Sequence, residues 1–322
     1  MRIKKTIKGV LAVALFFTMC FNASIPAKAD QMNQVYTALG DSLTDEHTYD
    51  GKSWTSYPTY ICDDLITNKG INVTLCNHGV GGFTTSDVLN QISTDEAVIN
   101  DIKSADFITL QVGANNITYA MITSLSDKGL MSLPFEYYLP EGTNVGACEI
   151  DAKDVLSNKE NEYHQKYITT AKDDLESIIT KIREYNPTAP IYIATVYYTQ
   201  EMFSMLFSSM FALSTYSGEV LADQYGVAAA ELRTYFEDAA AYYDNVYFVD
   251  NSAACDVYFF QYNEEGRICD IHPNANGQHA LAGAFEGAFS LAAKERFKND
   301  TSKALIDKFT ALGQKHRAIL VK

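Results

Sequence analysis

The chain has 322 residues, of which 47% are hydrophobic and 20% charged, with 18 glycines and 7 prolines. This composition is typical of one or two globular domains and excludes collagen-like, coiled-coil and disordered chains. The formal net charge of −15 argues against a nucleic-acid-binding surface, because binding to a phosphate backbone requires clustered lysine and arginine.

The first 29 residues have the pattern of a secretory signal peptide. Basic side chains precede a mostly apolar stretch over residues 9–21, and Ala27 and Ala29 supply the small residues that a signal peptidase requires. The apolar stretch is shorter than the roughly 20 residues that span a bilayer. We therefore expect cleavage after Ala29, a secreted protein and no stable membrane span; the alternative is an uncleaved N-terminal anchor.

Short β-rich runs alternate with helical patterns along the rest of the chain. The runs are largely apolar, which is typical of a parallel sheet covered on both faces, and they lie at residues 35–39, 72–75, 107–112, 191–196 and 246–249. A helical pattern from Ile168 to Ile182 stops at Asn186-Pro187, and further helices are expected over residues 219–242 and after Asn276.

This rhythm predicts a single α/β domain over residues 30–322. The expected architecture is a three-layer α/β/α sandwich around a five-stranded parallel sheet. Right-handed crossovers then place the functional loops at the carboxyl ends of the strands.

Two segments are longer than simple connections. Residues 117–163 follow the third predicted strand and residues 197–216 follow the fourth, and both are rich in Met, Leu, Phe and Tyr. Because both leave the carboxyl edge of the sheet, they are candidates for a lid or an acyl-binding wall. The alternative is that they are extra helices packed on one another.

The mature chain contains five cysteines. A bridge between Cys255 and Cys269 would brace the segment before His272, and burial of all five as small apolar side chains is the alternative. An odd number leaves at least one thiol free or paired between chains. No Cys or His cluster has the spacing of a metal site, and we expect no metal or other cofactor.

Two glycine-containing motifs follow the first two predicted strands. Ser42 lies in a Gly-Asp-Ser-Leu motif, where a turn would present its hydroxyl at the sheet edge; its alternative is a helix-capping role. Gly82 lies in a Gly-Val-Gly-Gly-Phe-Thr-Thr motif, where its N–H is suited to bind a developing oxyanion. No Gly-Lys-Ser/Thr sequence follows, which excludes a phosphate-binding loop.

Two further motifs carry an amide and an imidazole. Asn115, in a Gly-Ala-Asn-Asn motif after the third strand, offers a donor that does not titrate, or else is a turn residue. His272, in an Asp-Ile-His-Pro motif before the last helix, has an ordinary pKa of about 6.5, suited to take and return a serine proton. His47 and His78 lie in candidate cleft loops and are candidates for substrate binding.

In this order and at these places, the four motifs resemble those of the GDSL family, also called the SGNH hydrolases. The resemblance spans most of the mature chain, and the two long segments are its least-matched parts. It implies a flavodoxin-like sheet and a serine ester hydrolase in which Ser42 is the nucleophile and His272 the general base and then acid. It also implies an oxyanion hole formed by the backbone N–H groups of Ser42 and Gly82 with the Asn115 side chain.

The chain departs from the family pattern at the supporting carboxylate. That acid usually stands three residues before the histidine, where this chain has Cys269, whereas Asp270 stands two residues before His272. We expect Asp270 to orient the imidazole across a tight loop; a backbone carbonyl or another acid, such as Asp250, is the alternative.

These features predict a secreted esterase or lipase that acts through an acyl-serine intermediate. The expected substrate is a small-molecule or lipid ester, as the apolar segments suggest; the first alternative is a carbohydrate esterase that removes acetyl groups from a polysaccharide. A non-catalytic surface-binding protein on the same scaffold is the second alternative, against which the four intact motifs argue. No nucleic-acid partner is expected.

Overall fold

The computed structural model describes residues 33–46, 55–130, 143–210, 215–252, 260–262 and 268–292. For residues 209–210, 215–216, 260–262 and 268–271 it describes the backbone alone. The predicted signal peptide over residues 1–29 and Cys255 lie outside this part of the chain. The described residues from Gln34 onward belong to one unit.

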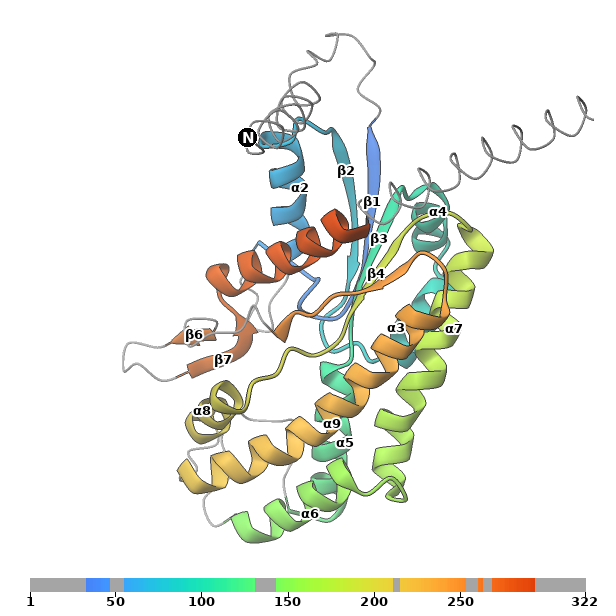
Figure 1. Cartoon of the computed structure of the whole chain (residues 1–322). Coiled ribbons are helices and arrows are strands. Elements are labelled where there is room, and N and C mark those ends of the chain that lie inside the picture. Colours follow the sequence, from blue (N-terminus) through green and yellow to red (C-terminus); the bar gives the residue numbers. More distant parts are fainter. Residues whose placement is uncertain are drawn as a thin grey trace, which may run out of the picture. The chain divides into compact units, whose positions relative to one another are not determined.

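A five-stranded parallel sheet organises this unit (Figure 1). Each strand falls on one of the predicted runs: β1 (Gln34–Gly40), β2 (Val73–Gly79), β3 (Phe107–Gln111), β4 (Ile191–Ala194) and β5 (Val246–Phe248). Their order is β2-β1-β3-β4-β5, and all four neighbouring pairs are parallel. This is the flavodoxin-like order, in which the chain changes direction across the sheet beside β1 and β3.

Helices cover both faces of this sheet. They are α2 (Tyr57–Thr67), α3 (Thr85–Thr94), α4 (Glu96–Ser104), α5 (Ala114–Asp127), α6 (Val145–Ser157), the π-helix η1 (His164–Thr169), α7 (Thr170–Tyr185), α8 (Gln200–Met210), α9 (Thr215–Tyr242) and a last helix over residues 275–292.

Side chains of the strands enter two apolar cores, one on each face of the sheet. On one face of the sheet, Tyr36 and Phe107 share a core with α2 and the helix over residues 275–292. On the other face, Leu110 and Ile193 share a core with α3, α4, α7 and the second half of α9. Figure 1 shows α2 on one side of the strands and α3, α4 and α7 on the other. The predicted three-layer α/β/α sandwich is therefore confirmed.

The two long segments are helical where the structure describes them. Residues 117–163 contain most of α5 and all of α6, and residues 197–216 contain α8. α5 packs against α6, and α8 packs against α9 and β7. In Figure 1 these helices lie beyond the carboxyl ends of the strands. They are thus helices packed on one another, as in the alternative interpretation, and α5 and α8 also line the cavity described below.

His272 lies in a hairpin that the sequence analysis missed. Residues 270–274 were expected to form a tight loop before the last helix, but residues 268–273 form strand β7, which pairs antiparallel with β6 (Phe260–Tyr262). A three-residue strand such as β6 is too short to show a periodic pattern. The expectation of a tight loop around Asp270 is therefore wrong.

The pairing of β1 sets where the functional loops begin. Gly40 stands opposite Gly79 of β2 and opposite Gln111 of β3. Hydrogen bonds continue the ladders past this point, from Val80 N to Gly40 O and from Asp41 N to Gln111 O, each 3.1 Å. The loops after β1, β2 and β3 therefore leave the sheet side by side.

Gly40 permits this close approach of β1 and β3. Its φ of +150° is a conformation that residues with a side chain rarely adopt. A Cβ atom at this position would lie 2.1 Å from the carbonyl oxygen of Gln111. Because the obstacle is backbone, no side-chain movement relieves it.

We predict that Gly40→Ala lowers the free energy of unfolding by about 3–5 kcal/mol, because it combines an unfavourable φ with a backbone clash. Gly70→Ala is the matched control, since Gly70 also has a positive φ but a Cβ there meets nothing within 4 Å. The control should cost about 1–2 kcal/mol, the penalty of the left-handed conformation alone. Urea unfolding measures both values, and equal losses would contradict the clash.

Candidate active site

A mostly apolar cavity of about 90 Å³ lies at the carboxyl edge of the sheet. Three of the predicted site residues line it: Ser42 from the turn after β1, Asn115 from the start of α5 and His272 from β7. The rest of the lining comes mainly from α5 and α8 and consists of Leu43, Ala114, Thr118, Met121, Ile122, Val196, Tyr197, Phe203, Leu206, Phe207 and Tyr225. The fold thus brings a hydroxyl, an amide and an imidazole to one apolar space.

The turn that carries Ser42 is held by Asp41. The Asp41 carboxylate accepts a hydrogen bond from Leu43 N at 3.0 Å, and its backbone carbonyl accepts from Thr44 N at 3.0 Å. Within the described part of the chain, the Ser42 hydroxyl makes no hydrogen bond. Catalytic hydrogen bonds are often long in free enzymes and tighten only when substrate is bound.

The Gly82 turn lies beside Ser42. A Cβ atom at Gly81 would be 3.9 Å from the Cβ of Ser42, which shows how closely this turn approaches the serine. Gly82 has φ +84°, and a Cβ there would lie 2.9 Å from the Tyr119 hydroxyl. Gly82 is not one of the residues that line the cavity, so the structure places it at the site's margin.

Asn115 connects this turn to α5. One N–H of its side-chain amide donates to the carbonyl oxygen of Phe83 at 3.0 Å. This hydrogen bond orients the amide and leaves its second N–H available to another acceptor. Asn115 also stands in the first turn of α5, where the helix dipole places partial positive charge. Both features suit a site where negative charge develops.

His272 is only 8% exposed and shares the cavity with Ser42. Asp270 stands opposite Gln261 in the β6–β7 pairing. The side chains of Asp270 and Cys269 lie outside the described part of the chain, so the role of Asp270 stays a prediction. The alternative acid Asp250 binds both terminal nitrogens of Arg233 at 2.9 Å, which holds the pKa of Asp250 below its usual value. Asp250 does not line the cavity.

The structure reveals an acid near the imidazole, Asp41, that sequence reasoning missed. Asp41 is 1% exposed, and one of its carboxylate oxygens has no hydrogen-bond partner in the described structure. Burial raises the pKa of Asp41 to about 7, and the Leu43 N–H and the nearby His272 offset part of this rise. From sequence alone, an aspartate next to a serine in a turn suggests a helix-capping residue. Its burial is visible only in the folded structure.

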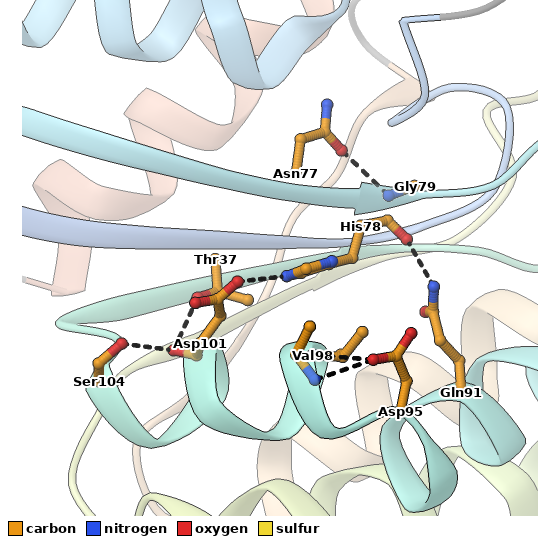
Figure 2. Close-up of polar contacts among 10 residues, drawn as sticks. Thr37, Asn77, His78, Gly79, Gln91, Asp95, Val98, Asp101 and Ser104 are labelled. Carbon is orange, nitrogen blue, oxygen red and sulfur yellow. Dashed lines mark hydrogen bonds and ion pairs between the residues drawn. The ribbon is translucent and has the colours of Figure 1, made fainter.

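The other candidate histidines do not join the cavity. His47 lies outside the described residues. His78 was expected in a cleft loop, but β2 continues to Gly79 and includes it. Figure 2 shows the His78 ring directed at Asp101 of α4, with 2.8 Å between Nε2 and Oδ2. Its backbone carbonyl accepts from Gln91 Nε2 at 3.1 Å. His78 therefore ties α3 and α4 to the edge strand, and its expected role in the cleft is wrong.

The described cysteine and acidic side chains do not form a metal site. Among the described residues, no group of three or more His, Cys, Asp or Glu side chains has the arrangement of a metal site. Cys62, Cys76 and Cys148 are free thiols. The predicted bridge between Cys255 and Cys269 lies outside the described side chains.

Among the residues that the structure describes, no helix is both long and apolar enough to cross a bilayer.

The four motifs lie within a segment that matches a known family. The sequence profile of the GDSL-like Lipase/Acylhydrolase family matches residues 38–280. The chain belongs to this family. As a member, it is a carboxylic ester hydrolase. No curated protein matches its sequence.

Solved structures share the fold at low sequence identity. A lipase from a goat rumen metagenome is 15% identical with a TM-score of 0.51, covering 80% of this chain and 97% of its own. An extracellular lipase from Streptomyces rimosus is 18% identical with a TM-score of 0.51, covering 79% and 99%. An acetyl xylan esterase from Geobacillus stearothermophilus is 18% identical with a lower TM-score of 0.44, covering 78% of this chain and 92% of its own.

We predict that Asp41→Asn changes the pH dependence of stability. Because the folded-state pKa of Asp41 lies above its ordinary value of 3.8, its favourable contribution is present below about pH 4 and is lost as the pH rises to about 7. The variant keeps an oxygen for Leu43 N and cannot ionise. Its midpoint of thermal unfolding should therefore rise relative to that of the unmodified protein between pH 4 and pH 8.

Asp154→Asn is the control for this experiment. The pKa of Asp154 is lowered by hydrogen bonds from Asn158 and Asn161, so its variant should show a smaller trend of opposite sign. A difference between Asp41→Asn and the unmodified protein that stays constant from pH 4 to pH 8 would contradict the burial argument.

Proposed function

We propose that the protein is an exported serine esterase that cleaves esters of apolar acyl chains through an acyl-Ser42 intermediate. The observation that carries this proposal is the shared cavity, in which Ser42, Asn115 and His272 meet an otherwise apolar lining. Membership of the GDSL-like Lipase/Acylhydrolase family supports the same reaction class. The basic and apolar pattern of residues 1–29 supports export.

In the proposed reaction, His272 takes the hydroxyl proton of Ser42 as the serine oxygen attacks the ester carbonyl. The backbone N–H groups of Ser42 and Gly82, with the remaining N–H of Asn115, stabilise the oxyanion; losing one such donor typically costs about 10²–10³ in rate. His272 then protonates the departing alcohol, and an acyl-serine ester remains. Water repeats the sequence with His272 as base and releases the acid.

Two acidic residues, Asp270 and Asp41, support the proposed role of His272 as base. Asp270 is proposed to orient the imidazole, because it precedes His272 by only two positions on β7 and is the acidic residue nearest to it in sequence. Asp41 adds negative charge near the imidazolium when it is ionised. Both effects favour the protonated ring that forms during attack.

The cavity supports an apolar acyl group. Its lining runs along α5 from Ala114 to Ile122, which is about 12 Å at 1.5 Å per residue, and continues over Leu206 and Phe207 of α8. An acetyl group would leave most of this surface uncovered, whereas a longer chain would bury it. Each buried methylene contributes about 0.8 kcal/mol, so two of them raise the rate about tenfold if they bind in the transition state.

We predict that the purified protein hydrolyses p-nitrophenyl hexanoate and octanoate with kcat/KM at least about tenfold above that for the acetate. Ser42→Ala should abolish hydrolysis and labelling by a fluorophosphonate. A preference for acetate together with release of acetate from acetylated xylan would instead identify a carbohydrate esterase. Absence of both hydrolysis and labelling in folded protein would favour a binding protein.

We also predict that Leu206→Trp shortens the acyl preference. Leu206 is buried and lines the cavity, so a larger ring there should lower kcat/KM for octanoate about tenfold and change that for acetate by less than about threefold. The control Met205→Trp makes the same kind of change at the preceding position of α8, where the side chain is exposed and does not line the cavity. Equal chain-length profiles in the two variants would place the acyl chain elsewhere.

A further inference from the structure

A buried chain of side-chain hydrogen bonds lies behind the loops that carry Gly82 and Asn115. Its members are Asn116 at the start of α5, Thr85 at the start of α3 and Asp174 of α7, with exposed fractions of 2%, 0% and 9%. None of these side chains lines the cavity. The chain joins three elements that are far apart in sequence, since Thr85 and Asp174 are separated by 89 positions.

The direction of each hydrogen bond in this chain is fixed. The Asn116 amide donates to Thr85 Oγ1 at 2.9 Å and to the carbonyl oxygen of Tyr167 at 2.8 Å, and its oxygen accepts from Thr85 N at 3.2 Å. Because Thr85 Oγ1 accepts from Asn116, its own proton goes to Asp174 Oδ2 at 2.8 Å. The chain therefore ends in a carboxylate, which strengthens every bond before it.

Capping of α3 does not explain this arrangement. Thr84 is the N-cap residue of α3, and it forms a reciprocal capping box with Asp87. The Thr85 hydroxyl is therefore not needed to satisfy the free N–H groups of the helix. Asp174, in turn, stands on the face of α7 that otherwise buries apolar side chains such as Leu175 and Ile178. A carboxylate there is costly to bury unless it is hydrogen-bonded, and Thr85 and Ser86 both donate to it.

This chain of hydrogen bonds connects directly to the two loops that carry Gly82 and Asn115. Asn115 holds the carbonyl of Phe83, and the adjacent Asn116 holds both the N–H and the hydroxyl of Thr85. The side-chain amides of Asn115 and Asn116 thus bind the segment that follows Gly82 at two points. The distance between the Gly82 N–H and the Asn115 amide depends on these hydrogen bonds.

We propose that Asn116, Thr85 and Asp174 form a positioning network that fixes the spacing of the oxyanion donors at Gly82 and Asn115. The proposal rests on the proposed function. Donors of this kind stabilise the transition state only when they are held within about 0.5 Å of the productive geometry. The network therefore affects kcat and has little effect on KM, because the ground-state ester does not depend on these donors.

Thr85→Val tests the network, because it removes the hydroxyl and keeps the shape of the side chain. We expect kcat for p-nitrophenyl octanoate to fall about tenfold to hundredfold with KM unchanged within about threefold, and Thr85→Ser to restore kcat to within about threefold. Ser124→Ala is the matched control, since Ser124 on α5 donates in the same way to the buried carboxylate of Asp151, at 3.1 Å, and touches neither loop. It should lower stability and leave kcat unchanged.

Asp174→Asn provides an independent variant if Thr85→Val does not fold. It removes the charge at the end of the chain while retaining an acceptor for Thr85, and a loss of kcat of at least about threefold at unchanged KM is expected. A kcat equal to that of the unmodified protein in Thr85→Val would contradict the proposed network. If Thr85→Val does not fold, the same result in Asp174→Asn would contradict it. If Ser42→Ala retained activity, the proposed function itself would fail, which is a separate result.

Discussion

The site depends on the pairing of β1 between β2 and β3. Because Gly40 stands opposite both Gly79 and Gln111, three strands end together and their loops start from one line. The ladder bonds from Val80 N and Asp41 N continue this alignment into the loops. A serine, a glycine turn and an asparagine from separate parts of the chain therefore meet without any long-range side-chain contact being required first.

Buried polar groups then refine what the sheet places approximately. Asp41 accepts a hydrogen bond within the Ser42 turn, and Asn115 and Asn116 bind the backbone of the segment that follows Gly82. Asp41 and Asn116 are buried and Asn115 is partly buried, so their hydrogen bonds act in a medium of low dielectric constant and resist displacement by water. The apolar helices α5 and α8 complete the site by lining the space next to Ser42. The proposed chemistry of the loops and the proposed binding of an acyl chain thus come from different layers of the structure.

Much of this arrangement could be predicted from sequence, because it depends on local patterns. Apolar runs marked the five strands, and the position of Ser42 and Asn115 just after two of them placed both residues at the site. The β6–β7 hairpin could not be predicted, since β6 has three residues and no periodicity. The contact of Thr85 with Asp174 and the burial of Asp41 depend on packing between distant segments, which a single sequence does not display.

The most direct test of this account is a crystal structure of the protein after reaction with an octyl fluorophosphonate. The account predicts phosphorus bonded to Ser42 Oγ, a phosphonyl oxygen about 2.7–3.1 Å from the Asn115 amide nitrogen, and the octyl chain between α5 and α8. An adduct on another residue, or one on Ser42 whose oxygen points away from both Asn115 and Gly82, would contradict it.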